Sequence, residues 1–480
     1  MLGAIIVVAA ALRLATLGSQ SFWVDESTTV HELRMSLGGL MHQISVNETT
    51  PPLYFVVAWI WAHGFGTGEV GLRLLSALCG IATVPVVFAC AGELFSRRVA
   101  LVAAGLAAIN PFLIWYSQEA RAYASLLLLL SLALLFWLRA LRTGGHGAVA
   151  AWAACAGLAV LTHFFAVFLI APQALWLLAR RRERTVILAC AALVAVQAAV
   201  LPLALGDTHH PLGWINAFPL ATRLQQVPVQ FGLGQLYQDS LVAQGLAGAA
   251  LVAAVVAALI VLGGYGRERR GAALLAGLAA ASILVPVGLA ELGRDYIVPR
   301  NLIGAWVPLS ILIALGCLAP RARVAGLLLL AGTVGGFIWA DVRTAGDAAL
   351  QRPPWHGVAD VLGPAPVPRA IAASDGNFAT EPLSIYLPEA RFQAPGPAPV
   401  TVQELDLVAA RPEQLIARLP PGVRQIESRT VGSERVWRLA LTTPWRLPPA
   451  AIGARAASLL DPAPPGAAVL LQQPGASHLA

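Results

Sequence analysis

The stretch AYASLLLLLSLALLFWLRAL, residues Ala122 to Leu141, decides the fold class. An α-helix rises about 1.5 Å per residue, so a run of this length reaches across the ~30 Å hydrocarbon core of a bilayer. Leu241 to Leu262 is a second such run. The whole chain of 480 residues is 58% hydrophobic and only 12% charged, whereas soluble domains are about a quarter charged. The sequence therefore predicts an all-α polytopic membrane protein.

Arginines between the apolar runs predict the topology. The chain has no lysine and a formal net charge of +7, and short arginine-rich loops stay cytoplasmic. No zinc-finger spacing or RNA-binding aromatic pattern accompanies the charge, so it does not indicate nucleic acid as a partner. The clusters are Arg97–Arg98, Arg139–Arg142, Arg180–Arg184, Arg267–Arg270 and Arg321–Arg323. With all five inside and the N-terminus cytoplasmic, we expect about 11 transmembrane helices, beginning near Leu2, Leu72, Val99, Ala122, Ala148, Phe164, Thr185, Leu241, Gly271, Asn301 and Ala322.

One apolar segment, Leu53 to Phe65, breaks the alternation. If it crossed the membrane fully, Arg97 and Arg98 would fall on the outer side. We therefore predict a juxtamembrane or re-entrant helix, because irregular spanning structure is tolerated where it lines a cavity. Residues 18–71 then form one large external loop of a transmembrane catalytic domain that covers residues 1–340.

The composition changes after Ala340. Residues 341–443 contain strand-like pieces such as RAIAAS and ERVWRLAL and a helix-like EPLSIYLP, which predicts a small external α/β domain. Residues 444–480 are rich in proline and alanine, and we expect them to be a disordered tail.

This topology collects ionisable residues on the outer face. Such residues cost about 2.5–3.5 kcal/mol each at membrane depth, so they usually face a cavity and have a function. A two-signed rim of this kind suits a charged amphiphile at the membrane surface. The ordinary explanation, that they are loop residues, is stronger for Glu48, Glu69, Asp207 and Glu291. The rim consists of Asp25, Glu26, Glu48, Glu69, Arg73, Glu119, Arg121, His163, Asp207, Glu291, Arg294, Asp295 and Arg300.

The stretch FWVDESTTV, Phe22 to Val30, places Asp25 and Glu26 directly after the first apolar run. Aromatic residues such as Phe22 and Trp23 anchor a chain at the membrane interface. A carboxylate fixed there could be a general base or a cation ligand. Alternatively, Asp25 could serve as the N-cap of a helix that starts at Glu26, since aspartate favours that position.

A second stretch, YSQEARAYA, runs from Tyr116 to Ala124 and contains Glu119 and Arg121. Residues two apart do not face the same side of a helix, but a turn could bring both to the rim. The planar fork of an arginine matches phosphate oxygens, and a structural ion pair is the plainer alternative. A third stretch, TTPPLYF from Thr49 to Phe55, opens the short apolar segment, where proline suits a first helical turn.

Together these residues resemble the superfamily of dolichyl-phosphate-mannose protein mannosyltransferases and lipid A aminoarabinose transferases, which are membrane glycosyltransferases of the GT-C class. The resemblance rests on the carboxylate pair after the first span and on five motifs, and it covers most of the first 390 residues. The motifs are PPLYF (51–55), GLRLLSALCG (71–80), YSQEARAYA (116–124), RDYIVPRNL (294–302) and QRPPWHGVADVL (351–362).

The resemblance implies a bacterial multi-pass enzyme of the inner, or plasma, membrane with its C-terminal domain outside. It would transfer a sugar from a polyprenyl-phosphate carrier to a lipid, glycan or protein acceptor on the non-cytoplasmic face. Asp25, Glu26 and Glu119 would then be catalytic, and His163 and Arg294 would be further site residues. Many relatives carry His or Lys before the two prolines, where this chain has Thr50, so other cations must bind the donor phosphate. The expected phosphate-site residues are Arg73, Arg121, Tyr123 and Arg300.

For the chemistry, we hypothesise that Asp25 is the base that deprotonates the acceptor hydroxyl, aligned by Glu26. Carboxylates are the usual groups around an oxocarbenium-like transition state, and arginines stabilise the leaving phosphate. A divalent cation at Asp25 and Glu26 could replace some of the arginine charge, and the sequence leaves this open. A lipid-linked sugar transporter would more often show repeated halves, and a non-catalytic scaffold or sensor would not require the paired carboxylates.

Overall fold

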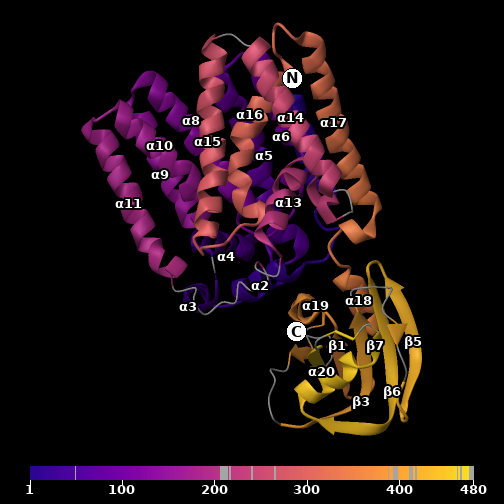
Figure 1. Cartoon of the computed structure of the whole chain (residues 1–480). Coiled ribbons are helices and arrows are strands. Elements are labelled where there is room, and N and C mark those ends of the chain that lie inside the picture. Colours follow the sequence, from indigo (N-terminus) through magenta and orange to yellow (C-terminus); the bar gives the residue numbers. More distant parts are fainter. Residues whose placement is uncertain are drawn as a thin grey trace. The chain divides into compact units, whose positions relative to one another are not determined.

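The computed structural model of the chain separates into two compact units (Figure 1). The helical unit contains Met1–Leu17 and Glu32–Gly346, and the sheet unit contains Gly18–His31 and Asp347–Ala480. The structure describes residues 1–48, 50–205, 215, 218–238, 242–263, 266–387, 389–392, 398–409, 415–416, 419–461, 463–464 and 467–474. The predicted rim residue Asp207 lies outside these ranges.

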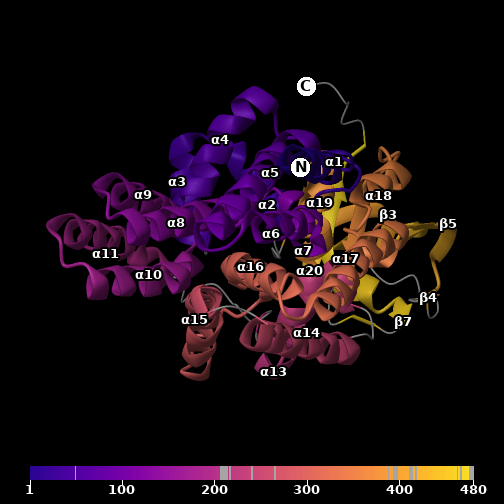
Figure 2. The same cartoon turned by 90° about the horizontal axis from the view of Figure 1, so that it is seen from above.

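The first part of the chain is helical. Its elements are α1 (Leu2–Leu14), α2 (Val24–Leu33), α3 (Leu37–Asn47), α4 (Leu53–Phe65), α5 (Glu69–Leu94), α6 (Arg97–Ile109), α7 (Pro111–Ser117), α8 (Tyr123–Thr143), α9 (His146–Thr162), η1 (Phe164–Ala166), α10 (Val167–Arg180) and α11 (Arg184–Leu205). The helical unit continues with α13 (Leu220–Leu233), η3 (Gly234–Gln238), α14 (Val242–Gly263), α15 (Gly266–Glu291), η4 (Pro299–Ala305), α16 (Trp306–Cys317) and α17 (Arg323–Gly346). Figure 2 shows α8 to α11 gathered on one side of this unit and α13 to α15 on another.

Membrane-spanning length is reached by fewer helices than the sequence predicts. Among the described residues, six helices are long and apolar enough to cross a bilayer, and a seventh span is possible if α6 and α7, bent by 57°, count as one. Several predicted spans fall on shorter apolar helices such as Leu2–Leu14 and His146–Thr162. A helix of 13 residues is only about 20 Å long. The structure therefore supports a polytopic helical membrane protein, while 11 spans remain a prediction.

The connection between α7 and α8 is tightly anchored. Gln118 donates hydrogen bonds to Thr16 Oγ1 at 2.8 Å and to the Arg13 carbonyl at 3.1 Å. Arg13 in turn donates through Nε to Ser117 Oγ at 3.1 Å. A Cβ atom at Gly80 would lie 2.1 Å from that Oγ, so α5 can approach α7 closely only because this residue is a glycine. The YSQEARAYA stretch is thus fixed in the helical unit.

The sheet unit contains a six-stranded sheet in the order β2-β8-β1-β3-β6-β5. Strands β1 and β3 pair in parallel, and the remaining pairs are antiparallel. Because successive side chains on a strand face opposite sides, β3 sends Leu405 and Leu407 into a core with Ile452 of α20, and Val408 into a core with Trp355 of α18. The elements are α18 (Trp355–Leu362), β1 (Arg369–Ala373), α19 (Asn377–Tyr386), β2 (Ala390–Phe392), β3 (Val400–Ala409), β4 (Leu415–Ile416), β5 (Val423–Val431), β6 (Glu434–Leu447), α20 (Pro449–Ala457), β7 (Leu460–Asp461) and β8 (Ala468–Gln472).

The expectation of a disordered tail over residues 444–480 is wrong for most of that segment. Strand β8 pairs with both β1 and β2 inside the sheet, and its residues Val469 to Leu471 are buried. Helix α20 contributes Ile452 and Ala456 to a core. The proline and alanine content of this segment suggested disorder, but it contains a short apolar strand, AVLLQ. This strand joins the sheet through partners that are far away in the sequence. Residues 475–480 lie outside the described residues.

Candidate functional site

The YSQEARAYA stretch and Glu48, the residue directly before TTPPLYF, meet at a buried ion pair. Arg121 donates from Nη1 and Nη2 to the two carboxylate oxygens of Glu48, at 3.3 and 3.4 Å. The two side chains are only 11% and 9% exposed. The guanidinium also lies over the ring of Phe55, 5.4 Å from its centroid. Helix α4 begins directly after Pro51 and Pro52 and so brings Phe55 against this pair. Glu48, which the sequence gave little reason to choose, belongs to the site.

A second arginine, Arg300, contacts the ring of Tyr123. Arg300, in η4, lies over the Tyr123 ring at 5.7 Å, and that ring lies 5.9 Å from the imidazole of His163. Burial, followed by the positive charges of Arg121 and Arg300, lowers the pKa of His163 to about 3. His163 occupies the connection between α9 and η1. With its pKa lowered to about 3, the imidazole is neutral at physiological pH. The structure thus brings together four of the predicted residues, Arg121, Tyr123, His163 and Arg300.

The segment that carries Arg300 is held by an ion pair that sequence reasoning missed. Arg223 of α13 donates to Asp295 Oδ1 at 2.8 Å, with a second short contact to Oδ2. The same guanidinium donates to the Ile297 carbonyl at 2.8 Å. The hydrogen bond from Arg223 lowers the pKa of Asp295 and keeps the pair charged. The RDYIVPRNL motif therefore contains its own anchor, Asp295, five residues before Arg300.

Glu32, at the end of α2, is a second carboxyl group that the sequence gave no signal to select. It is 1% exposed, and neither of its carboxylate oxygens has a hydrogen-bond partner among the described residues. Burial raises its pKa to about 8; the charge of Glu48 adds to the rise, and that of Arg121 opposes it. A buried polar group without a partner is unusual and generally has a reason connected with function. Glu32 therefore belongs with the electrostatic surroundings of Arg121.

Three of the predicted residues have other surroundings. Arg73 is 1% exposed and donates to the carbonyl of Leu17 at 3.1 Å, so it contacts the chain that follows α1. Glu119 is buried in the turn before α8, where its carbonyl accepts a hydrogen bond from the Arg121 amide at 2.8 Å. Arg294 is exposed. The predicted roles of these three residues remain predictions.

Asp25 and Glu26 lie in the first turn of α2, within the sheet unit. The helix begins at Val24, so Asp25 is not its N-cap as one alternative proposed; acidic residues in a first turn are nevertheless favoured by the helix dipole. Glu26 is fully buried, and its Oε2 lies 3.6 Å from Nε of Arg352. The Asp25 side chain is only partly buried. The two adjacent carboxylates therefore have different environments.

The described residues do not fit a metal centre at this pair. No group of three or more His, Cys, Asp or Glu side chains within the described ranges is arranged to hold a metal ion. The guanidinium of Arg352 lies beside Glu26 and supplies the positive charge that a cation would otherwise bring. This guanidinium would repel a metal cation bound at Glu26, because both are positively charged.

Comparison with known proteins supports the resemblance read from the motifs. Residues 49–205 match the family model of dolichyl-phosphate-mannose-protein mannosyltransferase. The apo structure of ArnT from Cupriavidus metallidurans matches with a TM-score of 0.52 at 15% identity, over 92% of this chain and 98% of that chain. ArnT bound to undecaprenyl phosphate gives 0.49 at 14% identity, over 91% and 97%. Archaeoglobus fulgidus AglB with an inhibitory peptide and a dolichol-phosphate gives 0.42 at 15% identity, over 75% and 57%. A comparison with curated protein sequences gives no match.

The family model matches one segment of the chain, whereas the structural similarity extends over most of it. The matched residues 49–205 extend from the start of α4 to the end of α11 and include Arg121, Tyr123 and His163. The similarity to apo ArnT extends over nearly the whole of both chains and shows that the fold is shared. The family match over residues 49–205 and the fold shared with apo ArnT therefore agree with the resemblance to membrane glycosyltransferases of the GT-C class.

Proposed function

We propose that this enzyme transfers a sugar from a polyprenyl-phosphate carrier to an acceptor hydroxyl on the non-cytoplasmic face of the membrane. The observation that carries the proposal is that Arg121 and Arg300 both act electrostatically on the buried His163, with Arg300 over the ring of Tyr123, which neighbours that imidazole. Burial is the main cause of the lowered pKa of His163 and the two guanidinium groups add to it, so this region is positively charged and suits an anion. The matched family takes its name from a polyprenyl-phosphate-linked mannose donor, which supports this class of substrate.

The arginines would bind the donor phosphate and stabilise it as it leaves. Arginine binds phosphate with two parallel hydrogen bonds, and preorganised positive charge is most effective where negative charge develops in the transition state. Arg121 is balanced by Glu48 in the described structure, so an incoming phosphate would take over part of that interaction. Arg300 is anchored through the Arg223–Asp295 pair and would add the second cation.

Asp25 would act as the general base. It accepts the proton of the acceptor hydroxyl while the hydroxyl oxygen attacks the anomeric carbon. The bond between that carbon and the phosphate oxygen breaks, and the polyprenyl phosphate leaves with the electron pair. Positive charge on the sugar ring rises in the transition state, and nearby carboxylates stabilise it. The partial exposure of Asp25, beside the fully buried Glu26, supports Asp25 as the carboxylate that an acceptor reaches.

A binding measurement tests the phosphate site independently of transfer. Purified protein is titrated with polyprenyl phosphate, and with polyprenol as the ligand that lacks the phosphate. We expect Arg121→Met and Arg300→Met each to weaken binding of polyprenyl phosphate at least tenfold, since a hydrogen bond to a charged group contributes about 1.5–3 kcal/mol, and to leave polyprenol binding unchanged. Arg139→Met is the matched control because it breaks another arginine–glutamate pair of the helical unit, with Glu93 at 2.8 Å. Equal binding by wild type and both arginine variants would contradict the proposed site.

A further inference from the structure

Within the sheet unit, the part that follows Asp347 contacts the segment Gly18–His31, which carries the two carboxylates. The backbone amide of Arg352 donates to Gln20 Oε1 at 3.1 Å, and its Nη1 reaches the same oxygen at 3.4 Å. Its Nε faces Glu26 at 3.6 Å. Both charged side chains are almost completely buried, at 3% and 0% exposure. Arg352 therefore lies between the chain before α2 and the first turn of α2.

Further contacts extend along the same segment. The His356 amide, at the start of α18, donates to Ser21 Oγ at 2.9 Å. The amide of Phe22 donates to the hydroxyl of Tyr386 at 2.8 Å. At the far end of the segment, the His31 imidazole lies 2.9 Å from Ser384 Oγ. Helices α18 and α19 thus contact the segment both before and after Asp25, which the sequence places in the first external loop.

We propose that Arg352 is a positioning residue that fixes Asp25 through Glu26, and that holding this catalytic segment is a function of the sheet unit. The inference rests on the proposed role of Asp25. The two adjacent carboxylates then have different roles: Glu26 holds the helix in place, and Asp25 reacts. Consecutive helical residues point about 100° apart, so an ion pair at Glu26 fixes the rotation of α2 and thereby the direction of its neighbour.

The physical basis is the burial of this charge pair. A carboxylate that is fully buried keeps its charge only when a partner compensates it, and removing one partner leaves the other charge uncompensated. Arg352→Met would remove this cation from beside the buried Glu26 carboxylate, and the first turn of α2 would rearrange. A displacement of about 1 Å at a reacting group can reduce the rate about 100-fold. Donor binding does not involve this segment and should not change.

The test measures transfer of labelled sugar from polyprenyl-phosphate sugars by the full-length protein in membranes. We expect Arg352→Met to lower kcat about 100-fold with the KM for the donor unchanged, and Arg352→Lys to recover part of the loss. The double variant Glu26→Gln/Arg352→Met should be more active per folded molecule than Arg352→Met alone, because position 26 then carries no buried negative charge. A merely structural arginine would lower the amount of folded enzyme and would not produce this recovery.

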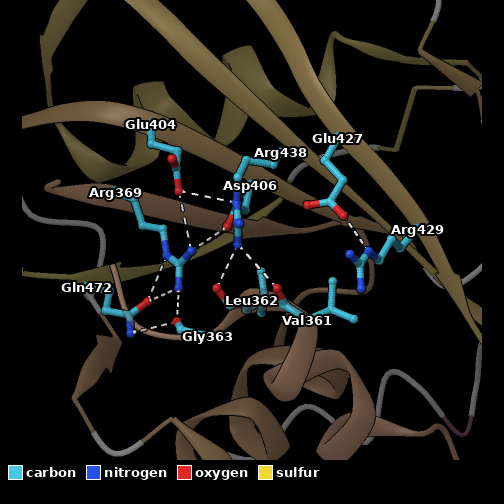
Figure 3. Close-up of polar contacts among 10 residues, drawn as sticks. All are labelled: Val361, Leu362, Gly363, Arg369, Glu404, Asp406, Glu427, Arg429, Arg438 and Gln472. Atoms are coloured by element: carbon cyan, nitrogen blue, oxygen red, sulfur yellow. Dashed lines mark hydrogen bonds and ion pairs between the residues drawn. The ribbon is translucent and has the colours of Figure 1, made fainter. Parts of the chain in front are cut away.

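Arg369→Met is the matched control. Arg369 is another buried arginine of the sheet unit, paired with Glu404 at 3.3 Å and with Asp406 at 3.0 Å, and it also donates to Gly363 and Gln472 (Figure 3). Its loss should reduce stability with kcat per folded molecule unchanged. Wild-type kcat in the Arg352→Met variant, or an equal loss of kcat in both arginine variants, would overturn the inference. If Arg352→Met does not fold, Glu26→Gln alone must lower kcat. Absence of transfer by the wild type from every polyprenyl-phosphate sugar supplied would instead refute the proposed function.

Discussion

Replacing Arg121 separates its role in stability from its role in the reaction. In the Arg121→Met variant, Glu48 loses its bidentate partner while it remains 9% exposed and close enough to Glu32 to raise the pKa of that group. Breaking a buried ion pair from one side costs about 3–5 kcal/mol, and we expect the lower end, about 3 kcal/mol, because both side chains are slightly exposed. The variant should also lose roughly 100- to 1,000-fold in kcat, which is the usual effect of removing one group that stabilises developing negative charge.

The double variant Glu48→Gln/Arg121→Met distinguishes the two effects. Stability should return, because no unpaired buried carboxylate remains at position 48. The kcat should stay low, since the cation proposed to bind the phosphate is still missing. Thermal unfolding in detergent measures the first quantity, and transfer of labelled sugar per folded molecule measures the second. Recovery of transfer together with stability would show that Arg121 serves only to compensate Glu48, and the phosphate role would then be wrong.

Three more outcomes follow from neighbouring residues. Burial raises the pKa of Glu32 from 4.5 to about 8, so its proton is held more tightly in the folded state. The contribution of this group to stability is therefore present below pH 4.5 and is lost as the pH rises to about 8. Glu32→Gln should flatten this decline in thermal unfolding measured between pH 5 and pH 8. Asp295→Asn should weaken binding of polyprenyl phosphate severalfold by releasing the segment of Arg300. Adding Arg223→Met should weaken binding little further, because residues in contact are not additive in a double-mutant cycle. Additive losses would contradict the Arg223–Asp295 pair as the anchor of that segment. Tyr123→Leu should weaken binding of polyprenyl phosphate, whereas equal binding would show that its ring does not help to place Arg300.

Local patterns allowed much of the helical unit to be predicted. The apolar runs correctly indicated long helices, and Leu53–Phe65 is a separate short helix, α4. The YSQEARAYA stretch led to Arg121 and Tyr123, which the structure brings close to His163 and Arg300. These four are separated by up to 179 positions in the sequence, and only their unusual polarity in an apolar chain connected them.

The residues that the sequence did not indicate depend on tertiary contacts. Glu32 has no motif around it, and its burial beside Glu48 arises from the packing of separate helices. Arg223 lies in a moderately polar stretch, and its partner Asp295 is 72 residues away. The strand Ala468–Gln472 is too short for a periodicity argument and is stabilised by pairing with β1 and β2. Arg352 was part of a recognised motif, QRPPW, but the motif gave no indication that Glu26 was its partner.

Transfer from a defined donor tests the central claim most directly. Membranes that contain the wild-type chain, or the Asp25→Asn variant at equal folded amount, are incubated with radiolabelled polyprenyl-phosphate sugars, and label in lipid, glycan and protein fractions is measured. We predict that label reaches an acceptor with the wild type only, since an amide cannot accept the proton of the attacking hydroxyl. Equal transfer by the wild type and Asp25→Asn would contradict the assignment of Asp25 as the base.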